Sequence, residues 1–235
     1  MGDFELMKEI VVAGKTKIVL LVMDGLGGLP LTPGGQTELE AARTPHLDRL
    51  AREGICGLTV PIGLGITPGS GPAHLAQFAY DPVACRIGRG VLEAVGIDFD
   101  LTPNDVAVRG NFCTIDENGL ITDRRAGRIS TEKAAELCAA LGSITLSDSR
   151  VEVFVQVVKE HRFVVVFRGE SLSPAIEDTD PQETGLAPYP ARAGAPEAQA
   201  TADLVNEWLD KARRVLAGHH PANMVTLRGF SKTPD

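Results

Sequence analysis

The sequence predicts an α/β protein in which a partial parallel sheet carries an inserted α+β domain. Residues 17–23 (KIVLLVM) are a short continuous apolar run, which is typical of a strand buried on both faces of a parallel sheet. A helix over 45–53 and a second strand over 56–60 are expected to follow, and this order begins a doubly wound sheet. After Pro82 the pattern changes to hairpins and mixed elements, which indicates a second module.

The helix over 45–53 has clear ends, because Thr44 and Pro45 form an N-cap and first-turn pair and Gly54 follows its last residue. In the second module, residues 116–119 (DENG) are a hairpin-turn signal. We predict strands over 106–115, 120–122, 151–158, 163–167 and 223–227, helices over 91–95, 131–141 and 198–217, and a loop over 169–197.

The composition is that of a soluble globular protein, with 43% hydrophobic and 23% charged residues among 235. This length is enough for one large domain or two modest ones with a real core. The formal net charge of −8 argues against a nucleic-acid-binding function. It does not exclude an anionic substrate, because a local cluster of arginines can override the average field of the protein.

Cysteine use and hydropathy predict a cytoplasmic protein without a membrane segment. No stretch approaches the roughly 18 apolar residues that cross a bilayer, and residues 1–15 lack the layout of a signal peptide. The cysteines show neither CxxC pairing nor zinc-site spacing, which favours reduced and mostly buried thiols. They are Cys56, Cys85, Cys113 and Cys138.

Ser70 lies between two glycines in the segment 66–75 (ITPGSGPAHL), and Pro72 follows at a first helical turn. This pattern places Ser70 at or just before a helix N-terminus, where backbone N–H groups and the helix dipole favour a phosphate or the serine alkoxide. The alternative is an ordinary N-cap serine. His74, one turn later, is interpreted as a helix histidine that hydrogen-bonds a neighbouring carbonyl, with a role as ligand as the alternative.

Asp24 follows directly after the predicted strand over 17–23 and is succeeded by glycines. Open α/β sheets place their ligands off the carboxyl ends of such strands. A hard carboxylate there, with glycines that give access, suits a divalent metal ion. The alternative is a solvated aspartate in a turn.

The segment 123–128 (DRRAGR) places three guanidinium groups within six residues of an acidic protein. Arginine forks match phosphate and carboxylate groups bidentately, so this segment indicates recognition of a specific anion. A solvated run of charges is the alternative. Further basic residues stand where predicted strands begin or end, and side chains there can converge on a cleft. The complete set of predicted substrate-binding residues is Arg109, Asp123, Arg124, Arg125, Arg128, His161, Arg162 and Arg228.

The order of these motifs resembles that of the alkaline phosphatase superfamily, and the details are similar to the archaeal-type branch of the cofactor-independent phosphoglycerate mutases. The resemblance covers nearly the whole chain. The segments that carry it are Asp24-Gly25, residues 44–51 (TPHLDRLA), the Ser70 segment with Tyr80-Asp81-Pro82, residues 109–112 (RGNF), residues 122–128 (TDRRAGR), His161-Arg162, residues 178–181 (DTDP) and Arg228-Gly229.

The resemblance implies an enzyme that interconverts 2- and 3-phosphoglycerate through a phosphoserine, with Ser70 as the nucleophile. It also implies two divalent metal ions, manganese first and magnesium, cobalt or zinc as alternatives, with Asp24 and Ser70 ligating one of them. Arginines of the inserted domain are expected around the phosphoglycerate. We expect Arg124, Arg125 and Arg128 to line a cleft that faces Ser70.

The resemblance further implies an alkaline-phosphatase-like metal-binding domain that begins in residues 1–84, a substrate-gripping insert over 85–222 and a return strand in 223–235. The family's other metal ligands, an Asp-x-x-x-His segment, an Asp-His pair and a further histidine, do not occur, so the match is to the first half to two thirds of a mutase. We therefore expect an incomplete second metal site and an isolated chain with little turnover that is poorly soluble or oligomeric. Gly71 also stands where many relatives have an acid.

Two alternative functions stay open. The chain could be another enzyme of the same superfamily, either a phosphohydrolase or a different phosphomutase. It could also be a non-catalytic fragment that binds phosphoglycerate or depends on a partner.

Overall fold

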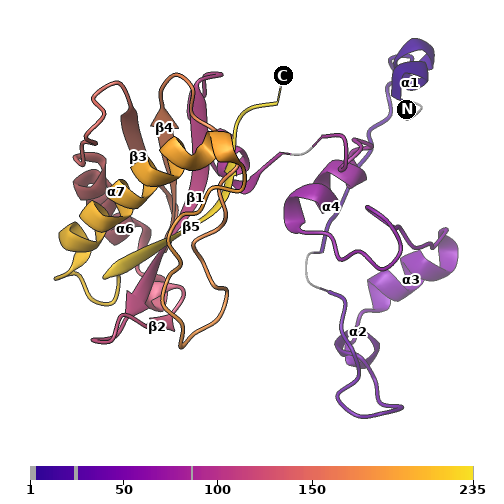
Figure 1. Cartoon of the computed structure of the whole chain (residues 1–235). Coiled ribbons are helices and arrows are strands. Elements are labelled where there is room, and N and C mark those ends of the chain that lie inside the picture. The colour runs from indigo at the N-terminus through magenta and orange to yellow at the C-terminus, as the bar shows by residue number, and fades with distance from the viewer. Residues whose placement is uncertain (1–3, 24–25, 86, 235) are drawn as a thin grey trace. The chain divides into compact units, whose positions relative to one another are not determined.

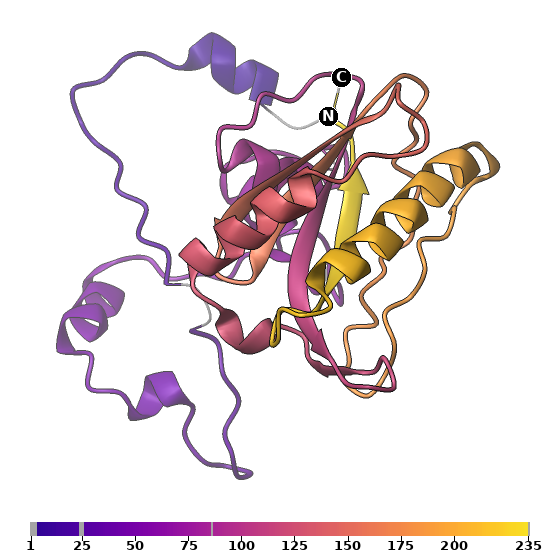
Figure 2. The same cartoon turned by 90° about the vertical axis from the view of Figure 1, so that its left-hand side faces the viewer.

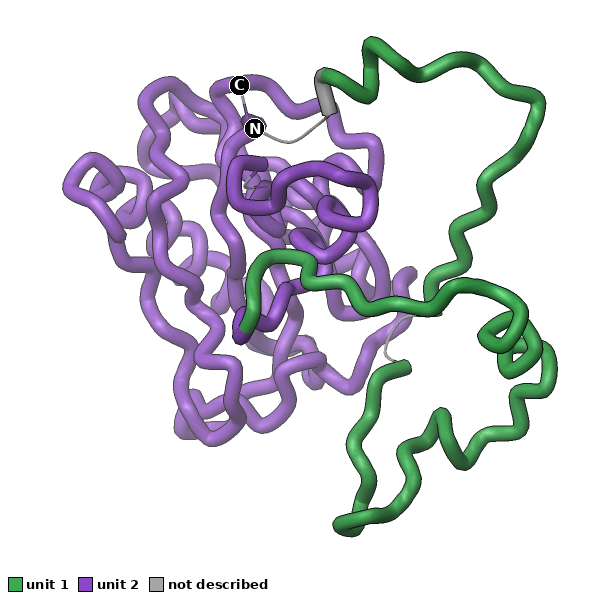
Figure 3. Tube along the Cα trace, turned by 90° about the vertical axis from the view of Figure 1, so that its right-hand side faces the viewer, with its two compact units in different colours: residues 1–64 green, residues 65–235 purple. Residues whose placement is uncertain are grey.

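The computed structural model describes residues 4–23, 26–85 and 87–234. The chain divides into two compact units, residues 1–64 and residues 65–235 (Figure 3). We describe each unit by itself.

The described residues of the first unit form the short helices α1 (Phe4–Ile10), α2 (Glu38–Ala41) and α3 (Pro45–Glu53) (Figure 1). Helix α2 begins with a capping box, in which the Thr37 hydroxyl accepts the backbone N–H of Glu40 and the Glu40 carboxylate accepts the N–H of Thr37. Helix α3 begins at Pro45 and is followed by Gly54, which confirms the predicted helix. None of the residues between 6 and 64 whose burial is described is buried.

The predicted strands over 17–23 and 56–60 are wrong for this structure. Both segments are irregular, and Ile18 and Leu58 are 98% and 100% exposed. An apolar run forms a buried strand only where a neighbouring strand pairs with its backbone N–H and C=O groups. Within the described ranges no segment pairs with either run. The apolar pattern therefore predicted burial, but the pairing that produces a strand does not form.

The second unit holds all the buried core of the described chain. Its elements confirm the predicted helices and strands after residue 85 to within a few residues. They are α4 (Ser70–Gln77), α5 (Arg89–Val95), β1 (Asp105–Ile115), β2 (Ile121–Asp123), η1 (Ala126–Arg128), α6 (Thr131–Gly142), β3 (Glu152–Lys159), β4 (Arg162–Arg168), η2 (Pro196–Ala198), α7 (Gln199–Leu216) and β5 (Met224–Ser231).

The strands form one open sheet in which β1 is central, pairing with β4 on one side and with β5 on the other, while β3 pairs with β4. Strand β2 pairs with the end of β1 beyond the hairpin turn. Every strand pair among the described residues is antiparallel, so the predicted α+β character of the chain after residue 85 is confirmed, whereas parallel pairing does not occur there. Strand β5, predicted as a return strand, joins this same sheet. The predicted boundaries after residues 84 and 222 stay a prediction.

Alternation along β1 gives the sheet two different faces, because successive side chains of a strand point to opposite sides. Val106, Val108 and Phe112 belong to the main core, which includes residues of α6 and α7. Figure 2 shows these two helices side by side on one face of the sheet. Trp208 of α7 is fully buried there and stands edge-on to Phe167, with 6.2 Å between ring centroids.

The opposite face is only partly covered. Helix α5 packs there through Val91 and Ala94 in a small core that also contains Ala107, Val164 and Val166. Beyond this contact, alternation places polar residues of β1, β4 and β5 on the same face. We call this surface the α5 face.

The predicted loop over 169–197 is confirmed, and part of it covers the edge of β5. The N–H of Thr179 donates to the carbonyl of Leu227, and the N–H of Leu227 donates to the Thr179 hydroxyl. The N–H of Gly229 donates to the Asp178 carboxylate. These bonds satisfy backbone groups of β5 that an edge strand would otherwise leave unpaired. None of the helices in the described ranges is both long and apolar enough to cross a bilayer.

The close approach of α5 to β1 predicts that Gly90→Ala destabilises the fold. A methyl group at Gly90 would clash with the backbone carbonyl of Ala107, which the sheet holds in place. We expect a loss of about 1–3 kcal/mol in the free energy of unfolding, measured by denaturant titration. The control is Gly142→Ala, at the exposed end of α6 with nothing within 4 Å of the added methyl. Equal stability of the two variants would contradict the packing described for α5.

Candidate anion-binding site

Ser70 is the first residue of α4, after Gly69 in extended conformation, which confirms that the serine stands at a helix N-terminus. Ser70 is exposed. The Nδ1 atom of His74 lies 2.6 Å from the Ser70 carbonyl oxygen, so the ring hydrogen-bonds the preceding turn, as interpreted from the sequence. The Ser70 side chain is thus presented at the end of a helix, with the positive end of the helix dipole behind it.

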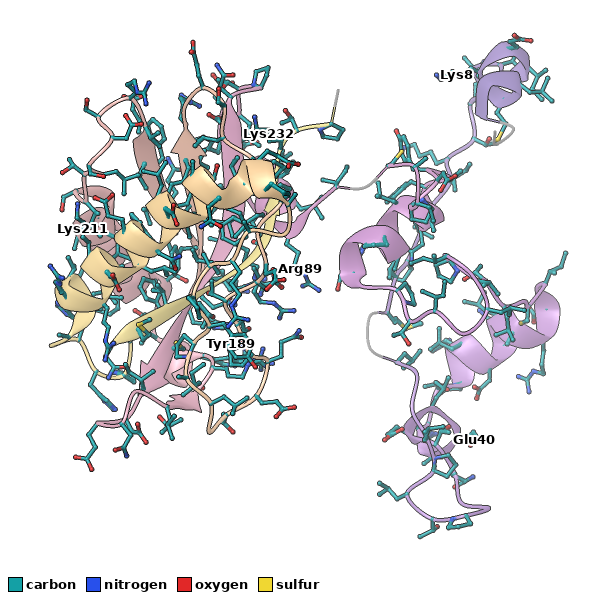
Figure 4. All side chains as sticks on the ribbon, viewed as in Figure 1. Lys8, Glu40, Arg89, Tyr189, Lys211 and Lys232 are labelled. Atoms are coloured by element: carbon teal, nitrogen blue, oxygen red, sulfur yellow. The ribbon has the colours of Figure 1, made fainter. Side chains whose placement is uncertain are left out.

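Ser70 borders a pocket of about 210 Å³ that is lined by three arginines, Arg89, Arg109 and Arg162, and by Glu93. Arg89 begins α5 and is labelled in Figure 4, while Glu93 lies one helical turn later. Arg109 comes from β1 and Arg162 from the start of β4. Three different elements of the second unit therefore bring positive charge to the serine.

Glu93 is the counter-ion of two of these arginines. Its Oε1 lies 3.4 Å from Nε of Arg109 and 3.9 Å from Nη1 of Arg162. Burial lowers the pKa of Arg109, Glu93 raises it, and repulsion by Arg162, Arg89 and Arg228 lowers it further, with a net downward shift. An arginine stays charged nonetheless. One carboxylate among several guanidinium groups leaves an excess of positive charge that a bound anion would relieve.

Arg124 and Arg228 are held by aspartates of the 169–197 loop. Arg124 donates to both carboxylate oxygens of Asp180, at 3.3 and 2.8 Å. Arg228 lies 3.4 Å from Asp178 and 3.7 Å from Asp180. Burial alone would raise the pKa of Asp180, but hydrogen bonds from Arg124 and from the N–H of Gln182 outweigh it, and the pKa is lowered. Asp180 is therefore an ionised, buried bridge between two arginines.

The segment 123–128 is folded around Asp123. Its carboxylate accepts the backbone N–H groups of Arg125 at 2.8 Å and Gly127 at 2.6 Å. Arg125 is exposed, and Arg128 pairs with Glu160 at 3.1 Å with its side chain 56% exposed. The residues that line the pocket beside Ser70 do not include Arg124, Arg125 or Arg128. The structure thus brings Arg109 and Arg162 to Ser70 and holds the 123–128 arginines through other contacts.

His161 is buried at the turn between β3 and β4, with 7% of its surface exposed. Its Nδ1 has no hydrogen-bond partner and lies 3.9 Å from the Glu160 carboxylate. Burial and then the charges of Arg162 and Arg128 lower the pKa of His161 to about 4. The imidazole is therefore neutral at pH 7 and adds no positive charge to the site.

The described residues do not form a metal centre. Within 4–23, 26–85 and 87–234, no group of three or more His, Cys, Asp or Glu side chains is placed to hold an ion. Asp24, the predicted ligand, lies outside the described residues, so the structure does not test its approach to Ser70.

Sequence reasoning missed Arg89, Glu93 and Asn111 as well as the two aspartates of the 169–197 loop. A signal existed for each. Arg89 and Glu93 stand four residues apart on a short helix, a spacing that places them on one side. Asn111 follows Arg109 by two residues in a strand and so shares its face. The aspartates belong to the DTDP segment that carried part of the family resemblance.

The lowered pKa of His161 makes a prediction about stability and pH. The unfolded histidine titrates near pH 6.5 and the folded one near 4, so the unfolded state binds more protons between these values. Stability is thus fully present above pH 6.5 and is lost as pH falls toward 4, by about 2 kcal/mol between pH 7 and pH 5. His161→Gln removes this loss. Denaturant titrations at both pH values test it, with His219→Gln as the exposed control. A wild-type pH slope in His161→Gln would contradict the assignment.

Comparison with known proteins identifies the family. The family model described as 2,3-bisphosphoglycerate-independent phosphoglycerate mutase matches residues 51–223. A Thermus thermophilus protein named "Probable 2,3-bisphosphoglycerate-independent phosphoglycerate mutase" is 49% identical over 234 residues, which is 100% of this chain and 58% of that protein. An Aquifex aeolicus protein of the same name is 44% identical over 98% of this chain and 58% of its own length. The chain thus spans less than two thirds of the length of these relatives.

Solved structures agree. The cofactor-independent phosphoglycerate mutase of Thermoplasma acidophilum superposes with a TM-score of 0.59 at 35% identity, over 69% of this chain and 46% of that one. A Pyrococcus horikoshii protein superposes with a TM-score of 0.63 at 28% identity, over 90% of this chain and 50% of that one. The resemblance found in the sequence is confirmed: this chain belongs to the family of 2,3-bisphosphoglycerate-independent phosphoglycerate mutases.

Proposed function

We propose that this chain takes part in the interconversion of 2-phosphoglycerate and 3-phosphoglycerate through a phosphoserine at Ser70. The observation that carries the proposal is the pocket in which Ser70, at the N-terminus of α4, meets Arg89, Arg109 and Arg162. A nucleophile among guanidinium groups suits a phosphorylated substrate. The names of the relatives support phosphoglycerate as that substrate.

The arginines would bind and orient the substrate. Phosphoglycerate carries a phosphate and a carboxylate, and arginine matches both groups bidentately. Arg109 and Arg162 are engaged by Glu93 at 3.4 and 3.9 Å, which are longer than charge-assisted hydrogen bonds of about 2.7–2.9 Å. Anionic oxygens of the substrate would therefore make better contacts with both guanidinium groups than Glu93 does.

The proposed transfer has two steps. The Ser70 hydroxyl loses its proton and attacks phosphorus, the bond from phosphorus to one glycerate oxygen breaks, and that oxygen takes up a proton. Glycerate then reorients, and its other hydroxyl loses its proton and attacks the phosphorus of the phosphoserine. The bond from phosphorus to the Ser70 oxygen breaks, and that oxygen takes up a proton, which restores Ser70. The N–H groups at the start of α4 and the arginines would stabilise the negative charge of the phosphoryl group in both steps.

Two divalent ions, manganese foremost, belong to the same proposal, with Asp24 and Ser70 as ligands of one. Such an ion, when bound, would lower the pKa of the serine hydroxyl and neutralise phosphoryl charge. The described residues do not fit a metal centre by themselves, so we assign no step to the ion.

The remaining predicted residues keep a proposed substrate role. Asp180 and Asp178 would hold Arg124 and Arg228 in place for the ligand, and Asp123 would set the turn that carries the basic segment. We propose substrate contacts for Arg124, Arg125, Arg128, His161 and Arg228, with Asp123 in support. A cytoplasmic location and phosphoglycerate as the bound small molecule are further parts of the proposal. Exposed apolar side chains such as Ile18 and Leu58 support an oligomeric or poorly soluble isolated chain. Low turnover of the isolated chain is a further part of the proposal.

The proposed nucleophile predicts that the chain, incubated with 3-phosphoglycerate and Mn²⁺, gains one phosphoryl group on the peptide that contains Ser70. Ser70→Ala should gain none, because the accepting oxygen is gone. Peptide mass spectrometry measures the modification. Ser149→Ala, on an exposed residue, is the matched control and should be modified like the wild type.

Two other results are informative. Phosphorylation that persists in Ser70→Ala would place the nucleophile elsewhere and contradict the proposal. Binding of 3-phosphoglycerate without modification of Ser70 would favour a phosphoglycerate-binding protein without transferase activity.

A further inference from the structure

Buried side-chain atoms without a hydrogen bond occur in and beside the candidate site, and one of them, Arg109 Nε, has only its 3.4 Å ion-pair contact with Glu93. Among the described residues, four side-chain atoms are buried without a hydrogen-bond partner: Arg109 Nε, Asn111 Oδ1, His161 Nδ1 and Trp208 Nε1. The first three belong to β1 or to the turn that begins β4, so three of the four lie in or beside the arginine cluster. Buried polar groups in folded proteins are nearly always hydrogen-bonded, and an unpaired group calls for an explanation.

Asn111 is a buried polar residue that β1 places on the α5 face, with 7% of its surface exposed. It follows Arg109 by two residues and therefore points to the same side of the sheet. Asn111 has one partner on each neighbouring strand: Arg162 lies opposite it on β4, and Thr226 lies opposite it on β5. Asn111 is thus next to Arg109 along β1 and next to Arg162 across the ladder, although it is not among the residues that line the pocket beside Ser70.

The chemistry of these groups is complementary. Arginine has only hydrogen-bond donors, so Arg109 and Arg162 can bind anionic oxygens but cannot accept a hydrogen bond from a hydroxyl group. Glu93 can accept one, but it is engaged by both arginines and its charge repels an anion. A carboxamide oxygen accepts a hydrogen bond without adding charge.

We infer that Asn111 recognises the hydroxyl group of the ligand through a hydrogen bond. The ligand is a phosphorylated hydroxy acid whose anionic groups are bound by Arg109 and Arg162, and its free hydroxyl donates to Oδ1 of Asn111. The inference rests on the proposed function and names the residue that selects the hydroxylated ligand. The side chains of Arg109 and Arg162 are 21% and 34% exposed. Because Oδ1 is buried in this structure, both arginine side chains would have to move toward the ligand to expose this oxygen.

The test compares 3-phosphoglycerate with 3-(phosphonooxy)propanoate, which differs only by lacking the hydroxyl. Titration calorimetry on the full chain in chelator measures both affinities without turnover. We expect the wild type to prefer 3-phosphoglycerate by about tenfold, since the analogue leaves the buried oxygen unpaired. Asn111→Ala should lose that preference: its affinity for 3-phosphoglycerate falls by about tenfold, and its affinity for the analogue stays within about twofold.

Three further variants complete the design. Asn111→Val also lacks the acceptor and suits a strand, so it replaces Asn111→Ala if that variant does not unfold cooperatively. Asn111→Asp keeps an acceptor oxygen and should keep a preference for the hydroxylated ligand, although its charge weakens the binding of both. Asn118→Ala, on the exposed hairpin turn, should behave as the wild type.

The outcomes separate the inference from the proposed function. A preference that survives in Asn111→Ala and Asn111→Val overturns the inference and leaves the proposed function standing. An equal loss of affinity for both ligands also overturns it, because that result indicates a packing role. A wild type that binds neither ligand overturns the proposed function and the inference together.

Discussion

The site depends on how a few carboxylates hold an excess of arginines on one face of a sheet. Glu93 lies between Arg109 and Arg162, and Asp180 between Arg124 and Arg228. Without these carboxylates the guanidinium groups would repel one another and extend into solvent. With them, the arginines converge, and the contacts of Glu93 with Arg109 and Arg162, at 3.4 and 3.9 Å, are long for charge-assisted hydrogen bonds.

This arrangement is a consequence of period-two alternation along β1. One set of its side chains packs in the core with residues of α6 and α7, and the other set includes Arg109 and Asn111 on the face that α5 covers. The antiparallel ladder places Arg228 opposite Arg109 and Arg162 opposite Asn111. The apolar face makes the sheet rigid, and the rigid sheet fixes the spacing of the polar groups on the other side.

Much of this could be predicted from the sequence, and the failures have physical causes. Local sequence signals predict the ends of a helix, the turn of a hairpin and the start of a helix without knowledge of distant partners. Such signals stand at Pro45 and Gly54, at 116–119 and at Ser70, and the structure confirms them. Strand formation over 17–23 depends on a distant partner, which an apolar run does not specify. The family motifs identified Arg109 and Arg162 but not Arg89. The positions of Glu93 and Asn111 relative to them depend on which elements become neighbours.

We propose that phosphoglycerate binds on the α5 face of this sheet, where it replaces Glu93 as the partner of Arg109 and Arg162. An NMR titration of the isotope-labelled chain with 3-phosphoglycerate in chelator tests it most directly, through the backbone amide and arginine side-chain signals. We expect saturable shifts of the signals of Arg109, Asn111 and Arg162. Shifts confined to other surfaces, such as the exposed Arg150, or no saturable shift at all, would contradict it.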